Sequence, residues 1–171
     1  MKALIIIDMQ TALMQDNPWN GQQVVENIRQ LRDKCRRQGV PVIYIRHDDG
    51  PDTALARGSA GWEIMPQLQP EKGEKIFDKQ YNSAFKGTGL QEYLRARGID
   101  TLVLCGMQTE YCVDATCKVA FELGFQVIIP RNTTTTFDCD FATGEALAKY
   151  YEEQIWAGRY ASVVPVEEVR L

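Results

Sequence analysis

The sequence has a single histidine, His47, and no pair of cysteines with the CxxC spacing of a zinc or redox motif. Its cysteines are odd in number and give no sign of a disulfide framework. They are Cys35, Cys105, Cys112, Cys117 and Cys139. We therefore expect a protein that uses neither a metal ion nor a cofactor.

The sequence also lacks any excess of basic residues and any long apolar run. Lysine and arginine number 19 against 23 acidic residues, which gives a net charge of -4, so nucleic acid is not an expected partner. The apolar run in MKALIIIDMQ is too short for a signal peptide, and no stretch approaches the length that spans a membrane. We expect a cytoplasmic protein without a membrane partner.

Apolar runs alternate with segments of helical spacing along the whole chain. The apolar runs predict six strands, at 3–7, 42–45, 75–77, 101–105, 126–129 and 162–164. The helical spacing predicts helices at 20–38, 89–97, 113–124 and 143–157. This alternation indicates an α/β fold, a three-layer α/β/α arrangement with a six-stranded parallel sheet. With 44% apolar residues, residues 1–171 are expected to form one domain.

Polar residues follow the ends of the first four predicted strands. They are Asp8, His47, Lys79 and Cys112, in strand order. In an open α/β sheet the ligand crevice lies beyond the carboxyl ends of the strands, where the strand order reverses. With the Rossmann-related order 3-2-1-4-5-6, the first and fourth strands are neighbours at that point. We therefore expect these residues to meet in one site.

Cys112 comes at the end of the stretch TLVLCGMQTEYCV, where a strand and a polar turn lead into a new helix. A thiol at a helix N-terminus meets the positive end of the backbone dipole and nearby N–H groups that can hold an oxyanion. Asp8 is suited to act as its base, and Lys79 to supply a positive charge. The alternative is that Cys112 is a small core residue, Asp8 caps a loop and Lys79 is solvated.

The segments ALIIIDMQ, FDKQYNSAFKGTGL and LVLCGMQTEYCV together resemble the isochorismatase-like cysteine hydrolase superfamily. The resemblance implies that Asp8, Lys79 and Cys112 form a catalytic triad. It also implies a cis peptide bond between Met107 and Gln108, an oxyanion hole made by the N–H groups of Gln108 and Cys112, and assembly as a homodimer or homotetramer.

Two departures from the family pattern bear on the activity. Nicotinamidases of the family bind a metal through an Asp-x-His motif and further histidines, which the single His47 cannot rebuild. Asn132 stands where many members have an aspartate. The presence of Cys112 favours hydrolysis of a small amide through a thioester over the vinyl ether hydrolysis of isochorismate, which can proceed without a cysteine. The open alternatives are that vinyl ether hydrolase, a non-catalytic binding module and a thiol redox sensor.

The expected substrate is a small molecule, and several residues near the motifs are candidates to bind it. Four aromatic residues are expected in the pocket wall: Trp19, Tyr81, Phe85 and Tyr111. Gln10 is expected to orient Asp8 or Lys79. His47 is expected either to hydrogen-bond the substrate or to be satisfied by its own loop. The long segment 50–73 is expected to border the pocket.

Overall fold

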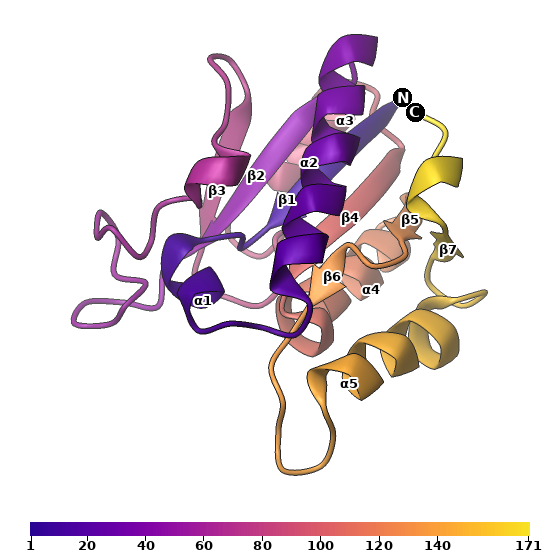
Figure 1. Cartoon of the computed structure of the whole chain (residues 1–171). Helices are drawn as coiled ribbons and strands as arrows, with labels where there is room; N and C mark the ends of the chain where they lie inside the picture. Colours follow the sequence, from indigo (N-terminus) through magenta and orange to yellow (C-terminus); the bar gives the residue numbers. More distant parts are fainter.

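The computed structural model describes residues 1–171 and contains a parallel sheet between layers of helices (Figure 1). The strand order is β3-β2-β1-β4-β5-β7, and all of these strands pair in parallel. The strands are β1 (Lys2–Ile7), β2 (Val42–His47), β3 (Lys75–Lys79), β4 (Thr101–Met107), β5 (Gln126–Pro130), β6 (Thr134–Thr135) and β7 (Ser162–Val164). The predicted fold and order are confirmed, with β7 as the predicted sixth strand.

One strand was not predicted. The two-residue β6 lies off the main order and pairs only with the end of β4, where Gly106 faces Thr134 and Met107 faces Thr135. This strand consists of two threonines within a run of four, so it has no apolar run from which it could be predicted.

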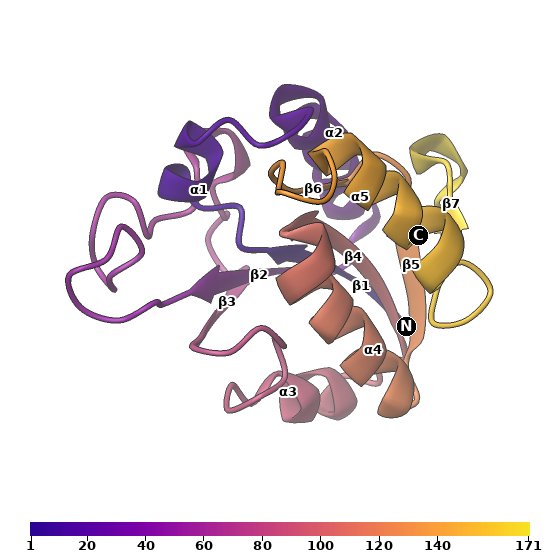
Figure 2. The same ribbon diagram turned by 90° about the horizontal axis from the view of Figure 1, so that it is seen from below.

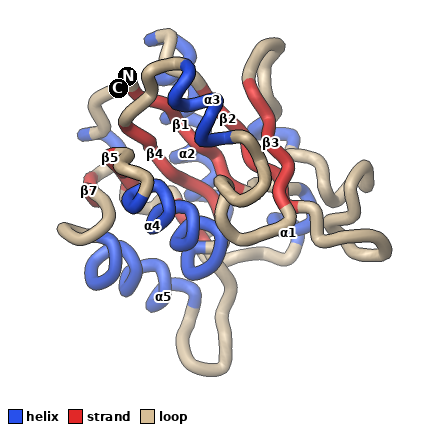
Figure 3. Tube along the Cα trace, turned by 180° about the vertical axis from the view of Figure 1, so that it is seen from behind, coloured by secondary structure: helices blue, strands red, loops and turns tan.

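Helices cover both faces of the sheet, as Figure 2 shows in a view along its edge. The α-helices are α1 (Thr11–Gln15), α2 (Gly21–Gln38), α3 (Leu90–Ala96), α4 (Asp114–Glu122) and α5 (Gly144–Tyr150). Two wide π-helical turns (Thr109–Val113 and Tyr151–Trp156) and two 3-10 turns (Pro66–Leu68 and Val166–Glu168) complete the set. Helix α2 covers one face, whereas α3 and α4 lie on the other, with α5 beside α4 (Figure 3). No helix is both long and apolar enough to cross a membrane.

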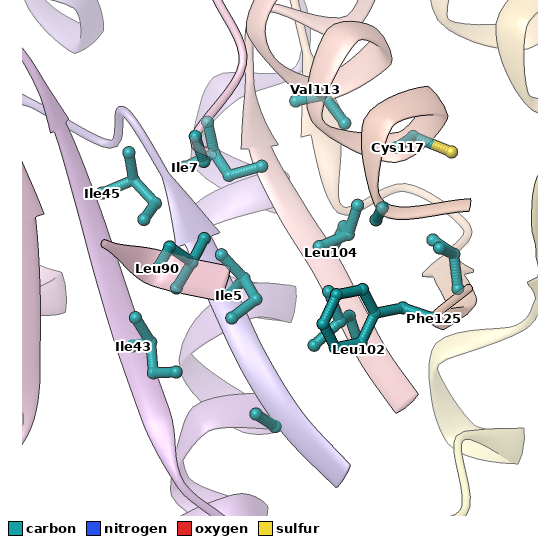
Figure 4. Packing of buried hydrophobic residues seen from close by; sticks show 14 of the residues in the cluster. Ile5, Ile7, Ile43, Ile45, Leu90, Leu102, Leu104, Val113, Cys117 and Phe125 are labelled. Carbon is teal, nitrogen blue, oxygen red and sulfur yellow. The ribbon is translucent and has the colours of Figure 1, made fainter. Parts of the chain in front are cut away.

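The buried strands divide their side chains between two cores. In β1, Ile5 and Ile7 point into the core under α3 and α4, whereas Leu4 and Ile6 point into the core under α2. The same alternation runs through β2 and β4, because successive side chains of a strand face opposite sides of the sheet. Figure 4 shows the core under α3 and α4, which includes Ile43 and Ile45 of β2. Where this alternation continues past the apolar core, it sets the face of the sheet on which a strand-end side chain lies.

Candidate active site

The side chain of Lys79 lies at the centre of a cluster of polar groups at the carboxyl edge of the sheet. Its Nζ lies 2.7 Å from Oδ2 of Asp8, 3.0 Å from Nδ1 of His47 and 3.2 Å from Sγ of Cys112. Lys79 and Asp8 are almost completely buried, at 2% and 1% exposure. The four residues that the sequence places after four different strands therefore meet at one ammonium group.

Strand register explains how Lys79 and His47 come together. The two residues are paired neighbours at the ends of β3 and β2. Their parity matches that of Phe77 and Ile45, which lie in the core under α3 and α4. Because side chains alternate along a strand, Lys79 and His47 extend this face of the sheet beyond the apolar core.

Asp8 departs from this alternation, since by parity it belongs with Leu4 and Ile6 on the α2 face. Its backbone has a φ of +51°, in the left-handed region that few residues other than glycine adopt. The strand ends at this residue, and the carboxylate reaches Lys79. Local strain in a polar residue at the switch point of the sheet is typical of a functional site.

Cys112 lies in the π-helical turn that leads from β4 into α4, and it is partly buried against the core. Burial, as the largest cause, and the Asp8 carboxylate together raise the pKa of its thiol to about 12, although the Lys79 ammonium acts to lower it. A carboxylate oxygen of Asp8 lies within 4.8 Å of the sulfur. At neutral pH the thiol keeps its proton, so a reaction at this sulfur requires a base.

Asp8 has an oxygen available for that proton. Oδ2 accepts the hydrogen bond from Lys79, whereas the buried Oδ1 has no hydrogen-bond partner in the protein. An unpaired buried acceptor is costly in a folded protein and calls for an explanation.

The turn before Cys112 leaves a backbone donor unpaired. The peptide bond between Met107 and Gln108 is cis, and the N–H of Gln108 has no acceptor within the chain. Gly106 has a φ of +119°, and a Cβ atom there would lie 2.0 Å from the carbonyl oxygen of Ile7. Only glycine allows β4 to approach β1 this closely immediately before the turn.

The same cluster contains possible metal ligands but does not fit a cation. One ligand atom each from Asp8, His47 and Cys112 lies within 4.8 Å of the others. The ammonium of Lys79 contacts all three of these residues, so a metal ion there would face a buried positive charge. The donor set serves a lysine and not a metal.

Gln10 bonds the backbone of His47, which is the neighbour of Lys79 in the cluster. It is completely buried, and its side-chain amide donates to the carbonyls of His47 (2.9 Å) and Trp62 (2.8 Å) and accepts from the N–H of His47 (2.8 Å). It contacts neither Asp8 nor Lys79 through these bonds. Gln10 therefore fixes the backbone at the end of β2.

The four aromatic candidates separate in the structure. Tyr81 and Tyr111 are about half exposed, at 50% and 52%. Tyr111 lies in the same π-helical turn as Cys112, and Tyr81 precedes Asn82 in the loop after β3. Phe85 is partly buried, packs against the core and stacks on Phe125, and its place in the pocket wall stays a prediction. Its position in a turn gave no sign of its inward direction.

Trp19 lies against the segment that follows β6. Its backbone N–H donates to the carbonyl of Thr136 (2.8 Å), and its Cβ faces Gly144 at the start of α5. Thr136 in turn donates to the carboxylate of Glu110, two residues before Cys112. Trp19 thus adjoins the turn that carries the cysteine without a described contact to the sulfur.

Sequence reasoning missed Asn82, whose Oδ1 lies 3.8 Å from the sulfur of Cys112. Its place three residues after Lys79 in FDKQYNSAF was the available signal. Asn132, by contrast, lies outside the cluster. It has a left-handed φ of +57° and ties the turn after β5 to Glu152 and Asn27. Asparagine suits this conformation, which explains the residue without reference to a ligand.

The segment 50–73 is anchored at the ends of β2 and β3. Arg57 pairs with Asp48 (3.7 Å) and Asp78 (3.3 Å), and Trp62 packs under the guanidinium of Arg46. A surface groove of about 510 Å³ lies elsewhere, between α1 and α2, and its lining includes Met14, Val25 and Met65. None of the cluster residues lines it, so volume alone does not mark the chemical centre.

The fold agrees with comparisons to known proteins. The isochorismatase domain matches residues 2–154 of this sequence. The chain belongs to the isochorismatase family. The structure of an isochorismatase from Pseudomonas putida KT2440 superposes with a TM-score of 0.93 at 26% identity, over 99% of this chain and 90% of that one.

The relatives with named activities include a hydrolase and an amidase. A streptothricin hydrolase of Streptomyces noursei is 31% identical over 140 residues, which are 81% of this chain and 51% of that protein. An N-carbamoylsarcosine amidase of an Arthrobacter species is 31% identical over 153 residues, which are 77% of this chain and 58% of that protein. The chain thus matches little more than half the length of either relative.

Proposed function

We propose that this protein is a cysteine hydrolase that cleaves a small amide through a thioester on Cys112. The observation that carries the proposal is that one buried ammonium, that of Lys79, bonds both the carboxylate of Asp8 and the sulfur of Cys112. A base, a charge and a nucleophile in contact are what acyl transfer to a thiol requires. The similarity to an N-carbamoylsarcosine amidase supports amide chemistry.

The first half of the reaction forms the acyl-enzyme. Asp8 takes the proton of the Cys112 thiol through its unpaired oxygen while Lys79 stabilises the thiolate. The sulfur attacks the amide carbonyl, and the oxyanion accepts hydrogen bonds from the N–H groups of Gln108 and Cys112. The intermediate collapses, the C–N bond breaks, and the leaving amine or ammonia takes the proton from Asp8.

The second half returns the thiol. Water attacks the thioester carbonyl and gives its proton to Asp8, and the oxyanion is held by the same donors. The C–S bond then breaks, and the sulfur recovers a proton from Asp8. Two successive half-reactions on one enzyme group predict release of the amine before the acid.

The test is ammonia or amine release from a panel of small amides, with intact-mass detection of the acyl-enzyme. We expect turnover by the wild type and by Cys139→Ser, which removes an exposed cysteine outside the cluster. We expect no turnover and no adduct for Cys112→Ala. If Cys112→Ala still hydrolyses a vinyl ether substrate, the isochorismate-type reaction replaces this proposal.

A redox-sensing role finds less support in the positions of the cysteines. Cys105 lies in the core under α2, on the opposite face of the sheet from Cys117 and from the core against which Cys112 packs. Cys117 is fully buried, and burial raises the pKa of its thiol to about 12. A sensor requires an accessible second thiol beside the first.

We further propose that residues 1–171 form a single domain that acts in the cytoplasm on a small-molecule substrate, as a homodimer or homotetramer. Exposed aromatic side chains support assembly: Phe141 is 98% exposed on the loop before α5, and Tyr150 is 53% exposed. Contiguous exposed apolar surface is typical of protein contacts, and a contact at Phe141 would bury the most exposed of these side chains. Light scattering across a concentration series tests the assembly, and a monomer at all concentrations would contradict it.

A further inference from the structure

We propose that His47 is a positioning residue, whose neutral ring accepts a hydrogen bond from Lys79 and thereby fixes the ammonium between Asp8 and Cys112. This inference rests on the proposed triad. The contact that carries it is the 3.0 Å separation between Nδ1 of His47 and Nζ of Lys79.

Counting donors and acceptors fixes the protonation of the ring. A lysine ammonium has three N–H donors and no acceptor. The structure gives it three partners, a carboxylate oxygen, a sulfur and Nδ1 of His47. Nδ1 is therefore unprotonated and the ring proton is on Nε2. Because each N–H has a partner, the ammonium has one preferred orientation.

The surroundings of His47 hold the ring for this purpose. Its backbone N–H and carbonyl are both bonded to the buried side chain of Gln10, which is itself anchored to the carbonyl of Trp62. The charged and titratable groups that face the ring come from other elements and from its own loop. They are Lys79, Asp8, Cys112 and Asp49. Oδ1 of Asp49 lies 3.7 Å from Nε2 of His47. Asp49 is 65% exposed and faces the nitrogen that carries the proton.

This arrangement has a chemical consequence for the cysteine. Lys79 is the group that lowers the pKa of the Cys112 thiol against burial and Asp8. Without Nδ1, one N–H of the ammonium loses its acceptor, and the ammonium is no longer fixed toward the sulfur. A doubly protonated ring would have no acceptor and would place a second cation beside Lys79. His47 thus acts on the nucleophile through Lys79 and not through the substrate.

The experiment measures the rate of Cys112 alkylation by iodoacetamide, followed by peptide-resolved mass spectrometry in a Cys139→Ser background. His47→Ala should slow the reaction roughly ten-fold to a hundred-fold, the size expected for loss of one hydrogen bond to a charged group. His47→Asn should restore most of the rate, because Oδ1 of asparagine occupies the place of Nδ1. His47→Gln, whose amide reaches toward the place of Nε2, should not. Asp52→Asn, which changes an exposed carboxylate of the same loop, is the matched control and should leave the rate unchanged.

Recovery by both amides or by neither would overturn the inference, as would equal rates for all variants. Lys79→Met, measured in parallel, separates the two levels of the argument. If Lys79→Met slows alkylation and the histidine variants do not, the inference about His47 fails and the triad stands. If Lys79→Met has no effect either, the proposed function fails with it. Thermal melting of each variant checks that the fold is retained.

Discussion

Replacing either partner of Cys112 should change the reactivity of its sulfur in opposite directions. The carboxylate of Asp8 raises the pKa of the thiol and the ammonium of Lys79 lowers it. In Asp8→Asn the negative charge is gone, so the pKa should fall and more thiolate should be present. In Lys79→Met the positive charge is gone, so the pKa should rise and less thiolate should be present.

The structure sets the size of the first effect. The carboxylate lies within 4.8 Å of the sulfur, and two unit charges at this distance interact by about 3 kcal/mol at an effective dielectric constant of ~20. This corresponds to roughly two pKa units. Thiolate nucleophilicity falls as the pKa falls, which cancels about half of the gain in thiolate. At about pH 9 we therefore expect alkylation of Cys112 to be roughly ten times faster in Asp8→Asn.

The assay is iodoacetamide alkylation at several pH values, resolved by peptide so that Cys117 and Cys35 serve as internal controls. Hydrolysis of amides should disappear in Asp8→Asn even though the sulfur reacts faster, because the base that moves the proton is missing. A slower alkylation in Asp8→Asn, comparable to that of Lys79→Met, would refute the opposing electrostatic roles assigned to the two residues.

Two further predictions concern stability, measured by urea unfolding. Lys79→Met should lower the free energy of unfolding by roughly 3–5 kcal/mol because it leaves the Asp8 carboxylate buried and unpaired. Adding Asp8→Asn to this variant should recover part of that loss. A double variant as unstable as the sum of the single variants would contradict this coupling. Gly106→Ala should cost more than about 3 kcal/mol, since its Cβ would lie 2.0 Å from the carbonyl oxygen of Ile7. Gly39→Ala, with a φ of +69° and no atom within 4 Å, is the control and should cost about 1 kcal/mol.

The sheet could be predicted because its central strands β1, β2 and β4 are built around continuous apolar runs buried on both faces. Strand ends followed from the same runs, and with the strand order they brought Asp8, His47, Lys79 and Cys112 to one edge. The five-residue helix α1 escaped prediction because it has no buried residue and so no apolar periodicity.

Side-chain directions in the turns were not accessible from the sequence. Phe85 stacks on Phe125, and the side-chain amide of Gln10 hydrogen-bonds the backbone of His47, although both residues lie close to motif residues in the sequence. The contact between His47 and Lys79 depends on strand register, which a single chain does not specify through apolar runs alone. The left-handed backbone of Asp8 likewise has no pattern in the sequence, although it decides where the carboxylate points.

The arrangement around Lys79 lowers the stability of the fold, which argues that it serves chemistry. Two ions are desolvated almost completely, and an acceptor of Asp8 is left without a partner. A neutral, well-packed pair in the same place would often be as stable or more stable. The cost makes sense if the unpaired oxygen receives the thiol proton and the ammonium stabilises the thiolate that results. A stability selection on its own would be expected to replace the pair Asp8 and Lys79 with apolar residues, whereas a selection for hydrolysis would be expected to keep them.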